Sequence, residues 1–221
     1  MAKAYLPLIG VILLVVVLWP YPVLIPLKLL VVFFHEASHA IMTVATGGEV
    51  VEMVISVDQG GHVLSRGGNR FLTLSAGYLG SLIWGVLIYL TALLSRLDRA
   101  LMFILGLSLL AIAAWWIRDV FALGFALATG GAMIASAIWL PMSFNDAVLR
   151  VIGVTSMLYA PLDIYSDTIE RSHLRSDAVM LGEAYGGSGM LWGVGWFLLS
   201  LAVIYVAFKF GHRSPPSSQN N

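Results

Sequence analysis

Residues 29–42 read LLVVFFHEASHAIM, an apolar run that three ionisable side chains interrupt. Such a run can lie within a membrane, where a charge at the bilayer centre costs at least about 2.5 kcal/mol. His35 and His39 lie four residues apart, so a helix places them about 40° apart on one face. Two imidazoles in that arrangement can bind one Zn²⁺, and Glu36 can act as general base on a metal-bound water. An inward-facing metal site would explain why polar groups are tolerated at this depth.

The same pattern is compatible with two simpler origins. The short motif can arise by chance, or the histidines can form hydrogen bonds with neighbouring helices and bind no metal. The chain holds three further histidines, which we interpret as ordinary polar residues: His62, His173 and His212.

The composition is that of an integral membrane protein. Of 221 residues, 59% are hydrophobic and 11% are charged, whereas soluble domains carry about 25% charged residues. We therefore expect a multi-pass protein in a lipid bilayer, although the sequence does not say which membrane. The net charge is zero, so nothing favours nucleic acid as a partner. Because there is no cysteine, the ligands of any metal must be His, Asp or Glu.

Apolar blocks divide the chain into candidate membrane spans of roughly 20 residues. The blocks lie near residues 4–19, 23–46, 71–94, 100–117, 120–140, 147–165 and 189–208. The first is short, and WPYP after it predicts a bend between two helices or within one. Because no small-residue cleavage site follows, we expect a retained span rather than a signal peptide. The fold class predicted is all-α and polytopic, with six or seven transmembrane helices in one domain over residues 1–211 and a disordered tail over residues 212–221.

One interval departs from the helical pattern. Residues 47–68 are rich in valine and bounded by paired glycines, which predicts a small β-hairpin between the motif helix and the next span. Its strands are expected at residues 50–57 and 61–66, with DQGG as the turn. The hairpin can be a simple surface element, or its edge can pair with an extended peptide. At membrane depth its backbone requires protein or a water-filled cavity as partner.

A catalytic zinc needs a third protein ligand and an open position for water. The segment MLYAPLDIYSDTIE, residues 157–170, offers Asp163 and Asp167, four residues apart. We favour Asp163 because it lies deeper in the apolar block, and we keep Asp167 as the alternative ligand or as a group that orients a histidine. Both can instead begin the polar segment and pair with Arg171 or Arg175. The other aspartates of the later chain are interpreted as ion-pair, loop or helix-cap residues: Asp119, Asp146 and Asp177.

These motifs together resemble the site-2 protease family of intramembrane zinc metalloproteases, in its compact, peptidase-like branch. The resemblance is firmest over residues 30–82, where HEASHAIMTVATGGEVVEM and GGHVLSRGGNRFLTLSAGYLGS stand. It implies Zn²⁺ as cofactor, with His35, His39 and Asp163 as ligands and Glu36 as the base. The later segment departs from the family's pattern, since Leu158 stands where an asparagine is common and Ile164 where a glycine is common.

The resemblance implies hydrolysis of peptide bonds in membrane-spanning substrates. Two other functions remain open: a catalytically inactive metal-binding protein that acts as a chaperone or sensor, and an ion transporter that relays ions through its His and Asp residues. Glu36 favours the protease, because a transporter does not need a glutamate directly after the first histidine.

Overall fold

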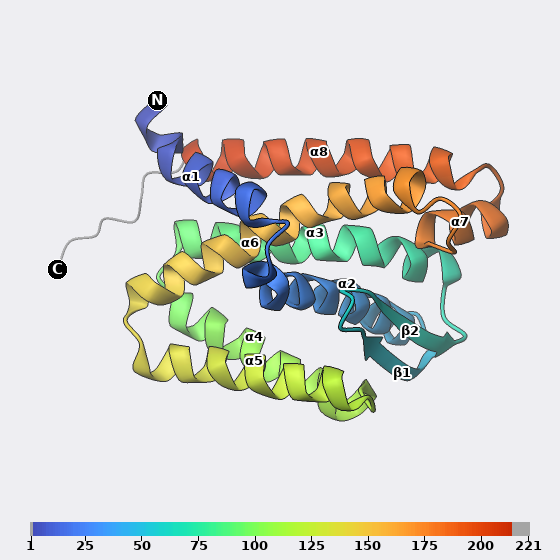
Figure 1. Ribbon diagram of the computed structural model, residues 1–221, viewed down its shortest axis with the longest axis horizontal. Helices are drawn as coiled ribbons and strands as arrows, with labels where there is room; N and C mark the ends of the chain where they lie inside the picture. Colours follow the sequence, from blue (N-terminus) through green and yellow to red (C-terminus); the bar gives the residue numbers. More distant parts are fainter. Residues whose placement is uncertain (1, 214–221) are drawn as a thin grey trace.

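The computed structural model describes residues 2–213, which form a helical bundle with one small hairpin (Figure 1). The elements in chain order are α1 (Ala2–Leu18), the short 3₁₀ turn η1 (Pro22–Leu24), α2 (Ile25–Ala45), β1 (Glu49–Ile55), β2 (Gly61–Arg66), α3 (Arg70–Leu94), α4 (Asp98–Trp116), α5 (Val120–Trp139), α6 (Met142–Tyr165), η2 (Ser166–Glu170), α7 (Asp177–Tyr185) and α8 (Gly189–Arg213). Six helical segments in the described chain are long and apolar enough to cross a membrane. The predicted all-α membrane fold is therefore confirmed.

The bend predicted at WPYP separates α1 from α2. α1 has 17 residues, fewer than the roughly 20 of a typical membrane span. The chain turns at η1, where Pro22 fixes the backbone at the first position of the turn. The prediction of six or seven spans thus resolves into six long helices and one short one.

Helix α2 runs through the middle of the bundle and carries the HEASH sequence (Figure 1). Every residue from Leu29 to Ala40 is buried, as expected for a helix that is apolar on nearly all sides. It packs against α3, α6 and both strands of the hairpin. The motif residues are therefore enclosed by protein rather than exposed to lipid.

The predicted hairpin is present, with its strands close to the expected bounds. β1 and β2 pair antiparallel, with Ile55 opposite Gly61, Met53 opposite Val63 and a bulge between Val50 and Glu52. On its other side, β1 forms a bridge from Met53 to Ile117, which follows α4. The outer edge of β1 is therefore partly covered, whereas β2 is the last strand of the sheet.

The polar segment after α6 contains two helical elements. α6 continues into the π-helical turn η2, in which the Arg171 N–H donates to the Ser166 carbonyl, five residues earlier, at 2.7 Å. A short helix, α7, then lies beside α3 and α8, at the same end of the molecule as the hairpin (Figure 1). π-turns are frequent at functional sites, and this one brings the chain back toward α2.

The C-terminal prediction is tested only at its start. Helix α8 extends to Arg213, so the first two residues of the predicted tail are helical. Residues 214–221 lie outside the described part of the chain.

Candidate active site

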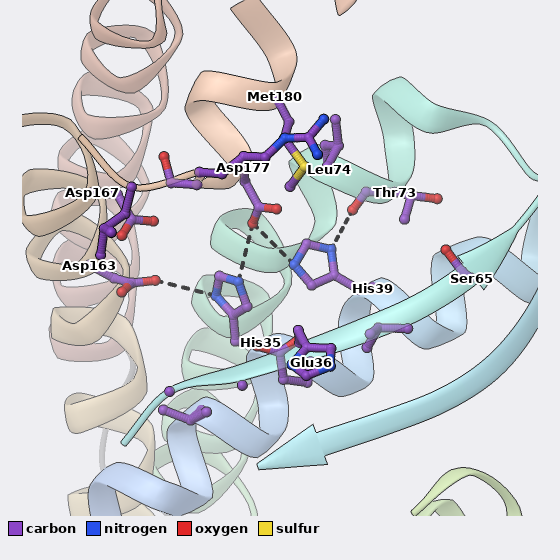
Figure 2. Close-up of a pocket in the computed structure, with 18 of the residues that line it drawn as sticks. His35, Glu36, His39, Ser65, Thr73, Leu74, Asp163, Asp167, Asp177 and Met180 are labelled. Carbon is purple, nitrogen blue, oxygen red and sulfur yellow. Dashed lines mark hydrogen bonds and ion pairs between the residues drawn. The ribbon is translucent and has the colours of Figure 1, made fainter. Parts of the chain in front are cut away.

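Helix α2 directs two imidazoles toward one aspartate of a distant element (Figure 2). Nε2 of His35 lies 3.2 Å from Oδ2 of Asp177, and Nε2 of His39 lies 3.1 Å from the same oxygen. These three ligand atoms all lie within 4.8 Å of one another, and the three side chains are buried. Such a group can hold a metal ion.

Asp177 comes from the first turn of α7, 142 residues after His35. From the sequence alone we interpreted it as a loop or cap residue. The cap is instead Ser176, whose Oγ accepts a hydrogen bond from the Val179 N–H at 3.4 Å. Since Ser176 already caps α7, the Asp177 carboxylate is left to face the two histidines. A serine directly before the aspartate was the one local signal that Asp177 is not needed as a cap.

The other ring nitrogen of each histidine faces a different acceptor. His39 Nδ1 lies 2.7 Å from the Thr73 carbonyl oxygen, to which it donates when it carries the proton. His35 Nδ1 lies 3.5 Å from Oδ2 of Asp163. An acceptor at Nδ1 favours the tautomer in which Nε2 keeps its lone pair for a metal. The Thr73 carbonyl supplies such an acceptor to His39, whereas His35 Nδ1 has no hydrogen-bond partner among the described residues. Both imidazoles direct Nε2 at the same oxygen of Asp177.

The structure separates Asp163 and Asp167 from the point where the three ligand atoms meet. Asp163 lies on the Nδ1 side of His35, and the Arg171 guanidinium lies 3.6 Å from its other oxygen. Asp167 accepts a hydrogen bond from the Tyr78 hydroxyl at 2.7 Å and pairs with Arg171 at 2.9 Å. The ion pairing with Arg171, which the sequence left open as an alternative, is thus present. Asp163, rather than Asp167, is the carboxylate that lies beside a histidine Nδ1.

The space between the three ligand atoms fits a metal ion. Gly77 of α3 borders it, and a Cβ atom added there would lie 2.7 Å from Asp177 Oδ2 and closer still to Nε2 of both histidines. Tetrahedral zinc with bonds of about 2.0–2.1 Å places its ligand atoms about 3.3 Å apart. The two nitrogen–oxygen distances are close to that value. Neutral imidazoles and a carboxylate are also ligand types that zinc accepts.

The electrostatic surroundings keep the Asp177 carboxyl ionised. Burial alone would raise its pKa. When both imidazoles carry a proton on Nε2, the charge of His39 and the hydrogen bonds that both rings donate outweigh burial and hold that pKa below its ordinary value. Because a carboxylate must be deprotonated to bind a metal, Asp177 is in the form that binding requires.

Glu36 faces the same cavity from the neighbouring position on α2. Within the described residues its carboxylate has no hydrogen bond or ion pair, although the side chain is buried. Gly61, at the start of β2, lies directly against it: an added Cβ would lie 2.7 Å from Glu36 Oε1. Glu36 is therefore free to exchange a proton. Its carboxylate lies beside the start of β2.

The cavity has a volume of about 590 Å³. Its lining residues come from α2, the hairpin turn and β2, the start of α3, the end of α6, η2 with the loop after it, and the start of α7. It is large enough for water and for several residues of an extended peptide.

Among the described residues, the edge of β2 that borders this cavity pairs with no other strand. The Ser56 N–H donates to the Gly60 carbonyl at 2.8 Å. From this pair the ladder alternates between hydrogen-bonded and non-hydrogen-bonded pairs, so that Met53 and Val63 form a non-hydrogen-bonded pair. Val63, opposite Met53, therefore directs its N–H and C=O away from β1. The alternation gives Gly61 and Ser65 the same orientation, and all three residues line the cavity.

Comparison with known protein families decides the identification. The model of the Peptidase M50B-like family matches residues 8–207, almost the whole chain. The chain belongs to this family. It is a family of site-2 proteases, so the resemblance found in the sequence is confirmed. Comparison with curated proteins and with solved structures finds no match.

Membership of the Peptidase M50B-like family fits the structure. Site-2 proteases are zinc-dependent membrane peptidases, and this chain has six candidate spans with a possible His and Asp metal site. The chain is thus an integral, multi-pass membrane protein of a peptidase family. The alternative of an ion transporter is not favoured.

Gly77 allows a test of the metal site in which no ligand residue is substituted. In Gly77→Ala the new methyl group would occupy the space between the three ligand atoms, so we expect zinc affinity to fall by at least about tenfold. Zinc per protein, measured after dialysis against a chelator, checks this. Gly131→Ala is the matched control, because an added Cβ at Gly131 has no neighbour within 4 Å. Full zinc content in Gly77→Ala would place the metal elsewhere.

Proposed function

We propose that this chain is an intramembrane zinc metalloprotease that hydrolyses peptide bonds of membrane-spanning substrates. His35, His39 and Asp177 hold the zinc, and Glu36 is the general base. The observation that carries the proposal is the meeting of three ligand atoms beside Gly77, next to a glutamate without a partner among the described residues. In this assignment Asp177 replaces Asp163, the third ligand expected from the sequence.

When bound, zinc would lower the pKa of a water molecule and polarise the scissile carbonyl. Glu36 accepts the proton of the attacking water and passes it to the leaving amine, as a general base and then a general acid. Asp163 orients His35 through Nδ1, and the Thr73 carbonyl orients His39 in the same way. Arg171 lies between Asp163 and Asp167 and pairs with both carboxylates, which keeps Asp163 beside His35.

The substrate must be extended to reach Glu36. A helical membrane segment uses its carbonyl groups in its own hydrogen bonds, so it has to unwind locally before hydrolysis. The open edge of β2 offers backbone partners to such a segment, beside the base that attacks it. We therefore favour a hairpin whose edge pairs with the substrate over a hairpin that is a simple surface element.

The direct test of the proposal combines metal analysis with a cleavage assay. Purified protein is assayed for bound zinc and for cleavage of single-span membrane proteins in detergent or liposomes. Zinc-dependent cleavage supports the protease. Bound zinc with no cleavage of any candidate would favour the inactive metal-binding protein.

A proline on the open edge tests the role of β2. Val63→Pro removes an N–H that faces the cavity and leaves the bonds to β1, so we expect cleavage to fall about tenfold or more with zinc content unchanged. Val63→Ala shortens the same side chain but keeps the N–H, and is expected to retain most activity. Equal cleavage rates for the two variants would show that the substrate does not pair with β2.

A further inference from the structure

We propose that the cavity selects peptides that carry a carboxylate a few residues from the cleaved bond, and that Arg70 binds this carboxylate. The inference rests on the proposed function and adds a substrate class to it. It concerns the end of the cavity that lies beyond the metal site, where β2 leads into α3.

The charges that line the cavity are unevenly distributed. Its carboxylates gather at the proposed metal site: Glu36, Asp163, Asp167 and Asp177. Three arginines also line it, of which two have carboxylate partners. Arg171 pairs with Asp167 at 2.9 Å, and Arg175 pairs with Glu183 at 3.0 Å. These two guanidinium groups are engaged by the protein itself.

Arg70 is the lining arginine without such a partner. Among the described residues its side chain has no ion pair or hydrogen bond, and it is exposed. It is the first residue of α3, directly after the cap Asn69, which accepts a hydrogen bond from the Leu72 N–H at 3.1 Å. A cation is unfavourable at the positive end of a helix, so Arg70 does not stabilise α3. An anion at this point gains from both the guanidinium and the helix end.

The hairpin relates this anion site to the cleaved bond. Gly61 lies against Glu36, and β2 leads from there through Ser65 to Arg66, four residues before the first residue of α3. A peptide paired with β2 advances about 3.3 Å per residue, as the strand does. The carboxylate that meets Arg70 is therefore roughly four to six residues from the bond that meets Glu36.

The carboxylate has two possible sources that share one chemistry. It can be the side chain of an Asp or Glu in the substrate, or the C-terminus of a peptide. Blocked and free C-termini distinguish these sources in the experiment.

The experiment measures binding in a protein that does not cleave. Zinc-loaded Glu36→Gln protein in neutral detergent is mixed with synthetic peptides of one apolar host sequence. The peptides are about four times as long as the expected spacing between the carboxylate and the cleaved bond. Each peptide has both ends blocked and carries either Asp or Asn at one position. A second set has no Asp but a free C-terminus. We expect peptides with Asp within one short range of positions to bind about tenfold more tightly than the same peptides with Asn, or peptides with a free C-terminus to bind about tenfold more tightly than their amidated counterparts.

Arg70 is tested in the same background. Arg70→Gln should abolish the preference, and Arg70→Glu should favour peptides with Lys within the same range of positions. Arg66→Gln is the matched control, because Arg66 is exposed on the same hairpin but does not line the cavity, and it should keep the preference. Equal binding of Asp and Asn peptides, or a preference that survives Arg70→Gln, would overturn the inference.

Three further outcomes are decisive. If Arg70→Gln abolishes binding to phosphatidylglycerol vesicles while no peptide preference exists, Arg70 belongs to a lipid-facing surface and the inference is wrong. Wild-type protein incubated with the same peptides tests the proposed function separately. Cleavage without an Asp preference overturns the substrate class alone, whereas an Arg70-dependent preference without any cleavage supports the anion site and counts against the protease.

Discussion

Glu36→Gln is expected to lower the rate of peptide hydrolysis by about 10²–10⁴-fold while zinc stays bound at its wild-type level. Glutamine has the size of glutamate and keeps α2 intact, but it cannot accept the proton of the attacking water. The structure leaves the Glu36 carboxylate unpaired among the described residues, so no ion pair is lost on substitution. The measurement is a cleavage time course beside zinc analysis of the same preparation.

The matched control is Glu52→Gln. Glu52 lies on β1 and does not line the cavity. The cleavage rate of Glu52→Gln should therefore stay close to that of the wild type. If Glu36→Gln cleaves within about tenfold of wild type with zinc bound, Glu36 is not the base. If neither the wild type nor the control cleaves the substrate, either the substrate or the proposed activity is wrong. The absence of cleavage by Glu36→Gln then says nothing about Glu36.

The spans could be predicted from the sequence because length and composition alone determine them. The blocks at 71–94 and 120–140 fall within one residue of α3 and α5 at each end. The start of α6 was missed by five residues, at Met142 rather than 147, since MSFND contains polar side chains. Asn145 is nevertheless fully buried, and its amide donates to the Ser136 and Pro141 carbonyls at 3.1 Å. Tertiary hydrogen bonds of this kind leave no periodic signal in the sequence.

Part of the candidate site could likewise be predicted from local sequence, and part depends on contacts between distant segments. His35, Glu36 and His39 share one helix, so their spacing was sufficient to bring them together. Asp177 depends on how the turn η2 and the short helix α7 fold back beside α3, which no local pattern specifies. Gly77 was interpreted as a packing residue of AGYLGS, and only the structure relates it to the ligand atoms. A metal site built from two distant segments requires the fold before its third ligand can be named.

The assignment of the third ligand is tested by comparing two aspartates. Asp177→Asn should lose zinc at equimolar metal and lose activity with it, because a neutral amide replaces the carboxylate that faces both Nε2 atoms. Asp163→Asn should remain loaded at saturating zinc, with affinity or activity lowered by roughly 10–100-fold, since it acts through His35 Nδ1. Asp167→Asn should have a smaller effect than Asp163→Asn, because it contacts Tyr78 and Arg171 rather than an imidazole.

Zinc affinity, measured by competition with a chromophoric chelator, separates these expectations from simple misfolding. Glu183→Gln serves as the control on α7: it removes the exposed ion pair with Arg175 but no group near the metal, so its zinc affinity should equal that of the wild type. Loss of zinc in Asp177→Asn but not in Glu183→Gln then reflects the ligand rather than the helix. If Asp163→Asn is the variant that comes out empty while Asp177→Asn stays loaded, the two roles are reversed. Asp163 would then bind the metal as the sequence first suggested, and α7 would have to move away from the histidines when zinc binds.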